Sequence, residues 1–476
     1  MLFNSLDYLV FFPLAAVLAF RSPRGARWAV LLALSVVFYG WWNPLYLLPL
    51  VVSAGTDYVA ARQMARHDTR AARRPWLLLS LAVNLGLLFA FKYAAFAATS
   101  VGALTGGALR PPVLDVVLPV GISFYTFQAL AYTIDVYRGR ERAEPHAGRF
   151  GLYVLFFPQL VAGPIERSQA LLPQLRAEPR WDAARAASGL LLILWGLLKK
   201  VVVADRLGLY VDAVYADPAG VGSVELLLAS YAFAFQIYGD FSGYSDIAVG
   251  SARILGVDLM ANFRRPYASA SVAEFWRRWH VSLSTWFRDY LYVPLGGNRR
   301  GEARTAANLF AVFLVSGLWH GAAWTFVAWG ALHGALVVAG RWTAPARDRL
   351  WARLGTAVQR FRRPLAIALT FHLVVLAWVF FRAATLGDAL FVLGRIADPS
   401  AFALPGAVAG FGPVRIAFAA GLVALMLWVE AAAGDASVER WAEAGRVRRR
   451  VFAVAGVAAV VLFGLFRQQA FIYFQF

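Results

Sequence analysis

Runs of about twenty apolar residues recur along the whole 476-residue chain, and they constrain its fold more than any other feature. A helix of that length crosses a hydrocarbon core of roughly 30 Å. Only helices and closed barrels satisfy their backbone groups in lipid, and the runs are far longer than barrel strands. Charged residues make up 15% of the chain, whereas a soluble protein is nearer a quarter charged. The sequence predicts an all-α polytopic membrane protein, one domain over residues 1–476, with about ten to twelve spans.

Clusters of basic residues between the apolar runs indicate which ends of the spans face the cytoplasm. The net charge of +19 fits the positive-inside rule better than a nucleic-acid partner, because the arginines fall in short segments between spans. Residues 2–20 lack a basic leader and a small-residue cleavage site, so we interpret them as a retained span rather than a signal peptide. Both chain ends are expected outside. The expected spans lie near residues 2–20, 28–42, 45–61, 76–98, 113–137, 186–213, 226–252, 365–381, 408–430 and 451–468.

Three further segments depart from simple spans. Residues 150–167 carry two prolines and basic residues at both ends, which indicates a re-entrant or interfacial segment. Residues 253–305 are rich in basic residues, and we expect them to form an amphipathic or re-entrant region at the cytoplasmic face. Residues 306–340 lack any acidic residue, lysine or arginine, yet basic segments flank them. We expect a hairpin of two short helices there, bent near Ser316–Gly321.

The stretch "SVAEFWRRWHVSLSTWFRDYLYVPLGG" (271–297) predicts one amphipathic helix. Ser271 and Glu274 form a possible capping box, and Pro294 with two glycines ends the element. Seven apolar residues fall in an arc of roughly 120°, with His280 at its edge. This pattern is typical of a helix at or just below the cytoplasmic surface. It serves as a simple membrane anchor or as part of a site, and we expect His280 to be less buried than His320.

His320 is the sharpest functional candidate. It lies in "SGLWHGAAW" (316–324), at membrane depth, where an ionisable side chain needs a compensating reason. Histidine is suited to accepting a proton near neutral pH without a metal. The plainer interpretation is a neutral imidazole that binds a backbone carbonyl at the bend. A metal site of His280 and His320 lacks further ligands, and the chain has no cysteine, so we expect no metal.

Other ionisable residues at depth leave two interpretations open. His333 and His372 are expected to be structural or lining residues, and His67 and His146 lie in cytoplasmic loops. Six charged residues at membrane depth remain: Lys92, Asp135, Lys199, Lys200, Asp240 and Asp246. They either form a proton or ion pathway in a transporter or pair as Lys–Asp contacts between helices.

Five stretches together resemble the membrane-bound O-acyltransferase family, and its bacterial alginate O-acetyltransferase branch in particular. They occur in order along nearly the entire chain, and the two that contain histidines are long. They are "LPVGISFYTFQALAYTIDVYRG" (118–139), "FPQLVAGPIER" (157–167), "DFSGYSDIAVG" (240–250), "EFWRRWHVSLSTWFRDYLYVPLGGNRRG" (274–301) and "SGLWHGAAW" (316–324).

The resemblance implies a multi-helix fold around a transmembrane funnel in the bacterial inner membrane. It implies catalytic roles for His320 and His280, acetyl-CoA as a cytoplasmic acyl donor, and an exported polysaccharide such as alginate as the acceptor. A periplasmic partner of the SGNH-hydrolase type often completes the transfer. The alternatives are a transporter or an acyl-transfer subunit without chemistry of its own. Guanidinium groups suit the CoA phosphates, and the candidates are Arg277, Arg278, Arg288, Arg299 and Arg300.

The tail at residues 469–476 ends in "FIYFQF", with four aromatics among six residues. One interpretation is an aromatic anchor at the outer membrane surface. The other is that the apolar residues wedge the tail into the outer mouth of the funnel. Tyr473 would then be a temporary acyl acceptor beside His320, since a phenolic ester is a reactive acyl donor. The tail resembles a terminal aromatic motif of the same branch.

Overall fold

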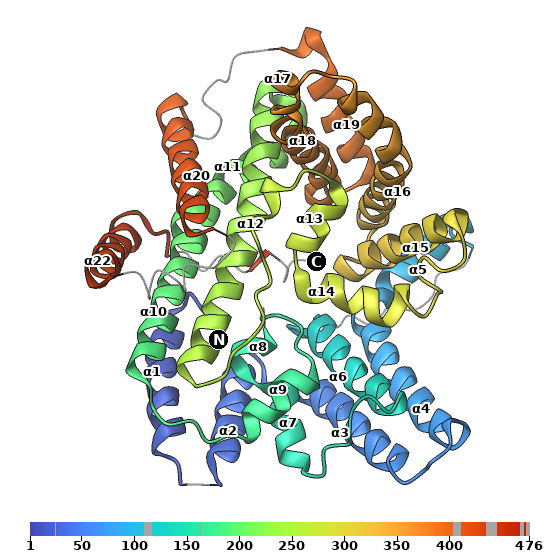
Figure 1. Cartoon of the computed structure of the whole chain (residues 1–476), viewed down its shortest axis with the longest axis vertical. Helices are drawn as coiled ribbons and strands as arrows, with labels where there is room; N and C mark the ends of the chain where they lie inside the picture. Colours follow the sequence, from blue (N-terminus) through green and yellow to red (C-terminus); the bar gives the residue numbers. More distant parts are fainter. Residues whose placement is uncertain are drawn as a thin grey trace. The chain divides into compact units, whose positions relative to one another are not determined.

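Helices are the main regular structure of the described chain. The computed structural model describes residues 1–23, 25–108, 117–161, 163–402, 411–434, 445–466 and 471–472, and these residues form helices and no strand (Figure 1). The all-α class is therefore confirmed. The chain divides into a first unit of Met1–Ile193 with Tyr244–Met260 and a second unit of Leu194–Gly243 with Ala261–Phe476. The expected single domain stays a prediction.

Five helical segments of the described chain are long and apolar enough to cross a membrane. They are Pro44–Met64, Arg70–Leu104, Ala183–Ala216, Thr356–Arg382 and Pro413–Ala433. Other expected spans form shorter helices: α1 (Leu6–Arg21) and α6 (Ile122–Tyr137) have 16 residues each. At 1.5 Å per residue such a helix is about 24 Å long, a little short of the hydrocarbon core. The count of ten to twelve spans stays a prediction.

A buried polar cluster joins two helices of the first unit. Asp57 on α3 (Leu47–Met64) is fully buried, and Asn84 Nδ2 on α4 (Arg70–Leu88) donates to both of its carboxylate oxygens at 3.1 and 3.0 Å. Ser80 Oγ donates to the same carboxylate. Helices in lipid gain little from apolar contact with one another, so such polar contacts help to hold them together. Besides α1, α3, α4 and α6, this unit contains α2 (Arg27–Gly40), α5 (Ala94–Leu104), α7 (Ala147–Leu155), α8 (Phe157–Leu160) and α9 (Ser168–Arg176).

The segment 150–167 consists of short, buried pieces. It contains the end of α7 and the four-residue α8, whose residues are all buried. The other parts of the protein cover these pieces, so the choice between a re-entrant and an interfacial segment stays a prediction.

The second unit contains the candidate histidines. α10 (Ala183–Leu197) belongs to the first unit up to Ile193 and then continues in the second through the π-helical η3 (Leu198–Ala204) into α11 (Asp205–Ala216). α12 (Ser223–Ile254) belongs to the second unit up to Gly243 and to the first from Tyr244. The remaining helices are α13 (Val272–Arg278), α14 (Val281–Phe287), η6 (Arg288–Tyr292), α15 (Glu302–His320), α16 (Trp324–Ala352), α17 (Thr356–Gln359), α18 (Arg362–Arg382), α19 (Leu386–Ala397), α20 (Pro413–Ala433) and α22 (Arg446–Phe463).

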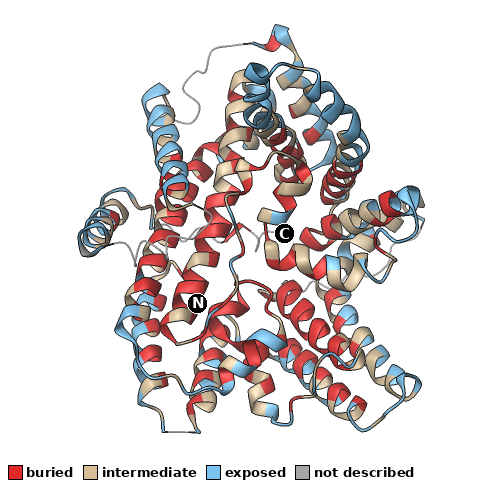
Figure 2. Cartoon of the chain, in the orientation of Figure 1, coloured by how far each residue is buried: buried red, intermediate tan, exposed pale blue. Residues whose placement is uncertain are grey.

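Burial separates core helices from peripheral ones within this unit. Buried residues dominate the part of α12 in the second unit, whereas α20 is exposed along most of its length (Figure 2). α20 buries Val423, Met426 and Val429. A long apolar helix with so small a buried face is suited to contact with lipid.

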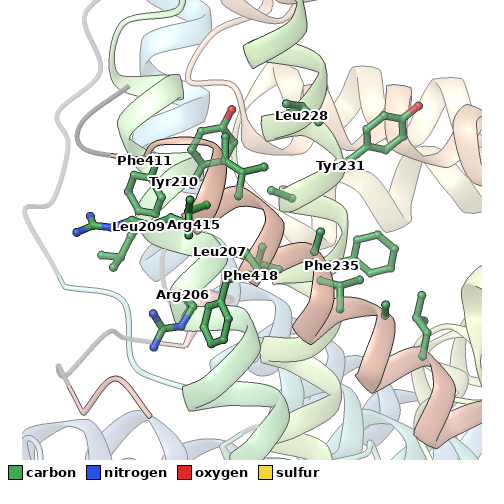
Figure 3. Close-up of a pocket in the computed structure, with 18 residues that line it drawn as sticks. Arg206, Leu207, Leu209, Tyr210, Leu228, Tyr231, Phe235, Phe411, Arg415 and Phe418 are labelled. Carbon is green, nitrogen blue, oxygen red and sulfur yellow. The ribbon is translucent and has the colours of Figure 1, made fainter. Parts of the chain in front are cut away.

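An apolar groove of about 650 Å³ lies between α11, α12 and α20 (Figure 3). Its lining is hydrophobic and aromatic apart from Arg206 and Arg415. No histidine lines it, so the candidate chemistry lies elsewhere in the unit.

Candidate active site

His320 lies at the last position of α15, beside the bend of a helical hairpin. The chain turns at residues 321–323 and returns as α16, so His320 lies at the bend of a hairpin as expected, but arms of 19 and 29 residues are not the two short helices that were expected. The second arm is longer than expected, because α16 runs past residue 340 to Ala352. Arg341 on this extension pairs with Glu302 at 2.7 Å and closes the open end of the hairpin.

Two glycines allow the two arms to approach each other. A Cβ atom on Gly330 would lie 2.4 Å from the carbonyl oxygen of Phe313, and one on Gly317 would lie 2.3 Å from that of Phe326. Real Cβ contacts are not so short, so no larger residue fits at either position without moving a backbone. The glycines thereby set where the end of α15, and with it His320, lies against α16.

Aromatic rings enclose the His320 imidazole, which is only 2% exposed. Its ring centroid lies 4.9 Å from that of Trp319, 5.0 Å from Trp329 and 5.6 Å from Phe381, each in an edge-to-face arrangement. These rings come from α15, α16 and α18. Such an apolar enclosure excludes bulk water from the imidazole.

His280 interrupts the helix predicted over 271–297. Its backbone φ of 44° is left-handed, and it separates α13 from α14. The prediction of one continuous helix is therefore wrong, although most of the apolar arc is buried as expected. The capping box is also half formed: Ser271 accepts from the Glu274 amide, but the Glu274 carboxylate accepts from Ala270.

His280 is fully buried, at 0% exposed, so the expectation that it is less buried than His320 is wrong. The reason is the break in the helix, which turns the side chain inward to Asn262 instead of leaving it at the rim. The Asn262 Oδ1 atom accepts the backbone N–H of Ser282 at 3.2 Å, which identifies that atom as the acceptor. His280 Nδ1 lies 3.1 Å from the same oxygen and must donate to it.

This hydrogen bond fixes the tautomer of His280. With the proton on Nδ1, the lone pair is on Nε2, where the ring can accept a proton or a hydrogen bond. Burial lowers the pKa of His280 to about 3, so the ring is neutral near pH 7. Asn262 was not among the residues predicted from the sequence, because an asparagine in "ANFRRPY" follows no periodic pattern.

Trp319 brings the two histidines into one aromatic cluster. Its ring lies 5.9 Å from that of His280 and 4.9 Å from that of His320. The two histidines therefore share a neighbouring ring in the second unit, while their catalytic roles stay predictions. Within the described ranges, no three His, Cys, Asp or Glu side chains gather as metal ligands would.

His333 contacts the same aromatic cluster through Trp329 and links two helices by a hydrogen bond. Its Nδ1 accepts from Trp276 Nε1 at 3.2 Å, which links α13 to α16. Trp329 lies between the two imidazoles of the hairpin, 5.0 Å from His320 and 4.8 Å from His333. These contacts agree with the structural role expected for His333.

Comparison with known proteins identifies the family. The model of the membrane-bound O-acyltransferase family matches residues 140–378, just over half of the chain. The chain belongs to this family. It is 41% identical over 403 residues to the probable alginate O-acetylase of Pseudomonas putida, which covers 83% of this chain and 80% of that protein.

Relatives with other acceptors are also similar. The peptidoglycan O-acetyltransferase of Helicobacter pylori is 36% identical over 78% of this chain and 74% of its own length. The teichoic acid D-alanyltransferase of Streptococcus thermophilus is 30% identical over 55% of this chain and 68% of its own length. The chain is therefore a membrane-embedded O-acyltransferase.

The candidate phosphate-binding arginines of this O-acyltransferase lie on the segments around α14. Arg277, Arg288, Arg299 and Arg300 are exposed, whereas Arg278 is partly buried. Arg278 pairs with Glu274 at 2.9 Å and Arg288 with Asp289 at 2.7 Å. The structure thus leaves four of the five side chains accessible to a ligand from solution.

The Lys–Asp interpretation of the buried charges is confirmed for Lys200. Its Nζ lies 2.8 Å from Asp240 Oδ1 and 2.8 Å from Asp205 Oδ1, all within the second unit. Asp205 was missed from the sequence, although its spacing of five residues from Lys200 matches the π-helical turn that brings them together. Lys199 instead lies over the rings of Trp195 and Tyr238. Elsewhere, Lys92 donates to Ser123 and Asp135 accepts from Gln169.

The C-terminal tail is described only at Phe471 and Ile472. Both are buried, at 0% and 4% exposed, as the wedge interpretation expects and a surface anchor does not. Tyr473, the predicted acyl acceptor, lies outside the described residues.

Proposed function

We propose that this O-acyltransferase passes an acetyl group from cytoplasmic acetyl-CoA to an exported polysaccharide such as alginate, at the bacterial inner membrane. The observation that carries the proposal is the buried, aromatic-enclosed His320 with His280 in the same cluster. The relatives named as O-acetylase or O-acetyltransferase match more of the chain than those named as D-alanyltransferase. Membership of an acyltransferase family favours this function over the transporter alternative.

His320 acts as the general base in this proposal. Its imidazole accepts the proton of the acceptor hydroxyl while the hydroxyl oxygen attacks the thioester carbonyl carbon. The C–S bond then breaks, and CoA leaves as a thiolate that takes up a proton. The aromatic enclosure keeps out water, which would otherwise compete with the acceptor and hydrolyse the acetyl group. His280, with its lone pair on Nε2, supports proton transfer or shapes the donor site.

The exposed arginines are proposed to hold the phosphates of acetyl-CoA. Arg277, Arg288, Arg299 and Arg300 present guanidinium groups to solvent, and guanidinium binds phosphate through two parallel hydrogen bonds. The double variant Arg299→Ala/Arg300→Ala should raise the KM for acetyl-CoA with little change in kcat. An unchanged KM would remove this pair from the donor site.

Tyr473 is proposed as an intermediate acyl acceptor. Its phenolic oxygen would take the acetyl group from acetyl-CoA with His320 as base, and a periplasmic partner of the SGNH-hydrolase type would then take the acetyl group from the phenolic ester. Mass spectrometry after incubation with acetyl-CoA should find an acetylated C-terminal peptide that is absent from Tyr473→Phe. Full polysaccharide acetylation by Tyr473→Phe would eliminate this relay.

A reconstituted transfer assay tests the activity. Proteoliposomes of the purified protein receive acetyl-labelled acetyl-CoA on one side and the acceptor polysaccharide with its partner on the other. We expect labelled ester on the polysaccharide, released by mild base, and none when acetyl-CoA is replaced by free acetate. Ion-coupled uptake by the same vesicles without ester formation would instead support the transporter.

A further inference from the structure

A buried ion cluster of Lys200, Asp205 and Asp240 lies on η3, α11 and α12. The side chains are 1%, 3% and 5% exposed. Both carboxylates contact the one ammonium group, so two formal negative charges face one positive charge. A buried carboxylate is costly unless its oxygens receive hydrogen bonds, so further donors around this cluster are stabilising.

The C-terminal segment supplies one such donor. The backbone N–H of Ile472 donates to Asp240 Oδ2 at 2.8 Å, while Asp240 Oδ1 faces Lys200. Asp240 therefore uses one oxygen for the cluster and the other for the tail. Figure 1 shows this piece of the tail beside α12. Hydrogen bonds to an ionised acceptor are about twice as strong as those between neutral groups, and this one lies away from water.

Side-chain packing extends the contact from the tail to His280. The Phe471 ring lies 5.4 Å from that of Phe241, and the Phe241 ring lies 4.7 Å from that of His280. Phe241 directly follows Asp240 on α12. One turn of α12 thus holds the tail backbone through Asp240 and the tail side chain through Phe241.

We propose that the Lys200–Asp205–Asp240 cluster and Phe241 form a seat that positions the C-terminal segment against the His280 side of the active site. Asp205 holds the Lys200 ammonium, Lys200 holds the Asp240 carboxylate, and Asp240 accepts a hydrogen bond from the Ile472 amide. Asp240 and Lys200 are positioning residues, because they act through the tail and the aromatic cluster rather than on substrate. This proposal depends on the proposed function in one respect. Tyr473, which follows Ile472 directly in sequence, is the proposed acyl acceptor.

The cysteine-free sequence allows a direct test of the seat. A Phe471→Cys background gives up the ring contact with Phe241 but keeps the Ile472 N–H, so it isolates the hydrogen bond to Asp240. Its thiol is the sole one in the protein, and the rate of reaction of this thiol with a maleimide reports release of the tail. The test change is Ile472→Pro, which removes the N–H donor at the chain end and leaves the core intact. The matched control is Ile472→Val, which keeps the donor and a branched apolar side chain. Asp240→Leu removes the acceptor, and Asp212→Asn removes an exposed carboxylate of α11 as its control.

We expect the maleimide rate at position 471 to rise about tenfold or more in Ile472→Pro and in Asp240→Leu, and to stay within twofold in both controls. Equal rates in Ile472→Pro and Ile472→Val would overturn the seat. A thiol placed at the buried Val214 instead of position 471 distinguishes tail release from general loosening. If Asp240→Leu also raises the maleimide rate of the thiol at position 214, this variant loosens the whole protein. Ile472→Pro then decides whether the hydrogen bond holds the tail, because its change is confined to the tail.

The thiol measurement needs no acetyl-CoA, so it fails or succeeds independently of the proposed function. A released tail with unchanged polysaccharide acetylation would confirm the seat and eliminate the relay through Tyr473. A released tail with acetylation reduced about tenfold would support both. A tail that stays protected in Ile472→Pro while His320→Ala is inactive would eliminate the seat alone.

Discussion

Asn262 determines which tautomer His280 adopts. Because the Ser282 amide already donates to Asn262 Oδ1, His280 Nδ1 must carry a proton, and Nε2 is the atom available for chemistry. Neither fact follows from the histidine-containing stretch alone. The sequence singled out His280 and His320 as the two candidates, and both rings contact Trp319, but their catalytic roles stay predictions. It could not locate Asn262, which lies 18 residues away.

His280→Asn should lower the rate of acetyl transfer about tenfold or more while the protein stays folded. Asparagine tolerates the left-handed backbone at this position, and its amide can donate to Asn262 in place of the ring. It offers no ring nitrogen with a lone pair, so proton transfer through this position is lost. Initial rates and the thermal unfolding midpoint are measured on the same preparations. A wild-type rate of acetyl transfer with an unchanged unfolding midpoint would instead support the interpretation of α13 and α14 as a membrane anchor.

The hairpin of α15 and α16 is the element that carries His320. Its bend was predicted from the uncharged stretch between basic segments, and the two glycines explain how closely its arms pack. The helix over 271–297 was predicted wrongly, because the spacing of apolar residues reports which side chains are buried and not whether the backbone is continuous. The left-handed residue His280 breaks the helix, yet Phe275, Trp276 and Trp286 stay buried on both sides of the break.

Gly330→Ala should destabilise the protein by about 1–3 kcal/mol and reduce acetyl transfer. The added methyl group would lie 2.4 Å from the Phe313 carbonyl oxygen, so α15 must move away from α16 and His320 moves with it. Gly340→Ala is the matched control on the same helix, since nothing lies within 4 Å of its Cβ position. It should be neutral or slightly stabilising, because alanine favours helix. Equal unfolding midpoints and rates for the two variants would contradict this account of the hairpin.

At the scale of the whole molecule, the sequence predicted the all-α fold class and the protein family better than the number of membrane spans. Apolar runs identify buried or lipid-facing helices, but α1 and α6 are only 16 residues long, and length alone does not say whether such a helix crosses the membrane. The buried ion cluster was half predicted. Lys200 and Asp240 stood out as charges in apolar surroundings, whereas the contact of Asp240 with Ile472 joins residues 232 apart and leaves no local pattern.

The central claim is that His320 is the general base of acetyl transfer, and the rate of labelled acetyl transfer by His320→Ala tests it most directly. The matched control is His372→Ala, because His372 is exposed on α18 and lines none of the aromatic cluster around His320. We predict that His320→Ala lowers the transfer rate at least about a hundredfold, with an unfolding midpoint close to that of the wild type, while His372→Ala keeps full activity. Transfer by His320→Ala within twofold of the wild-type rate would contradict the claim.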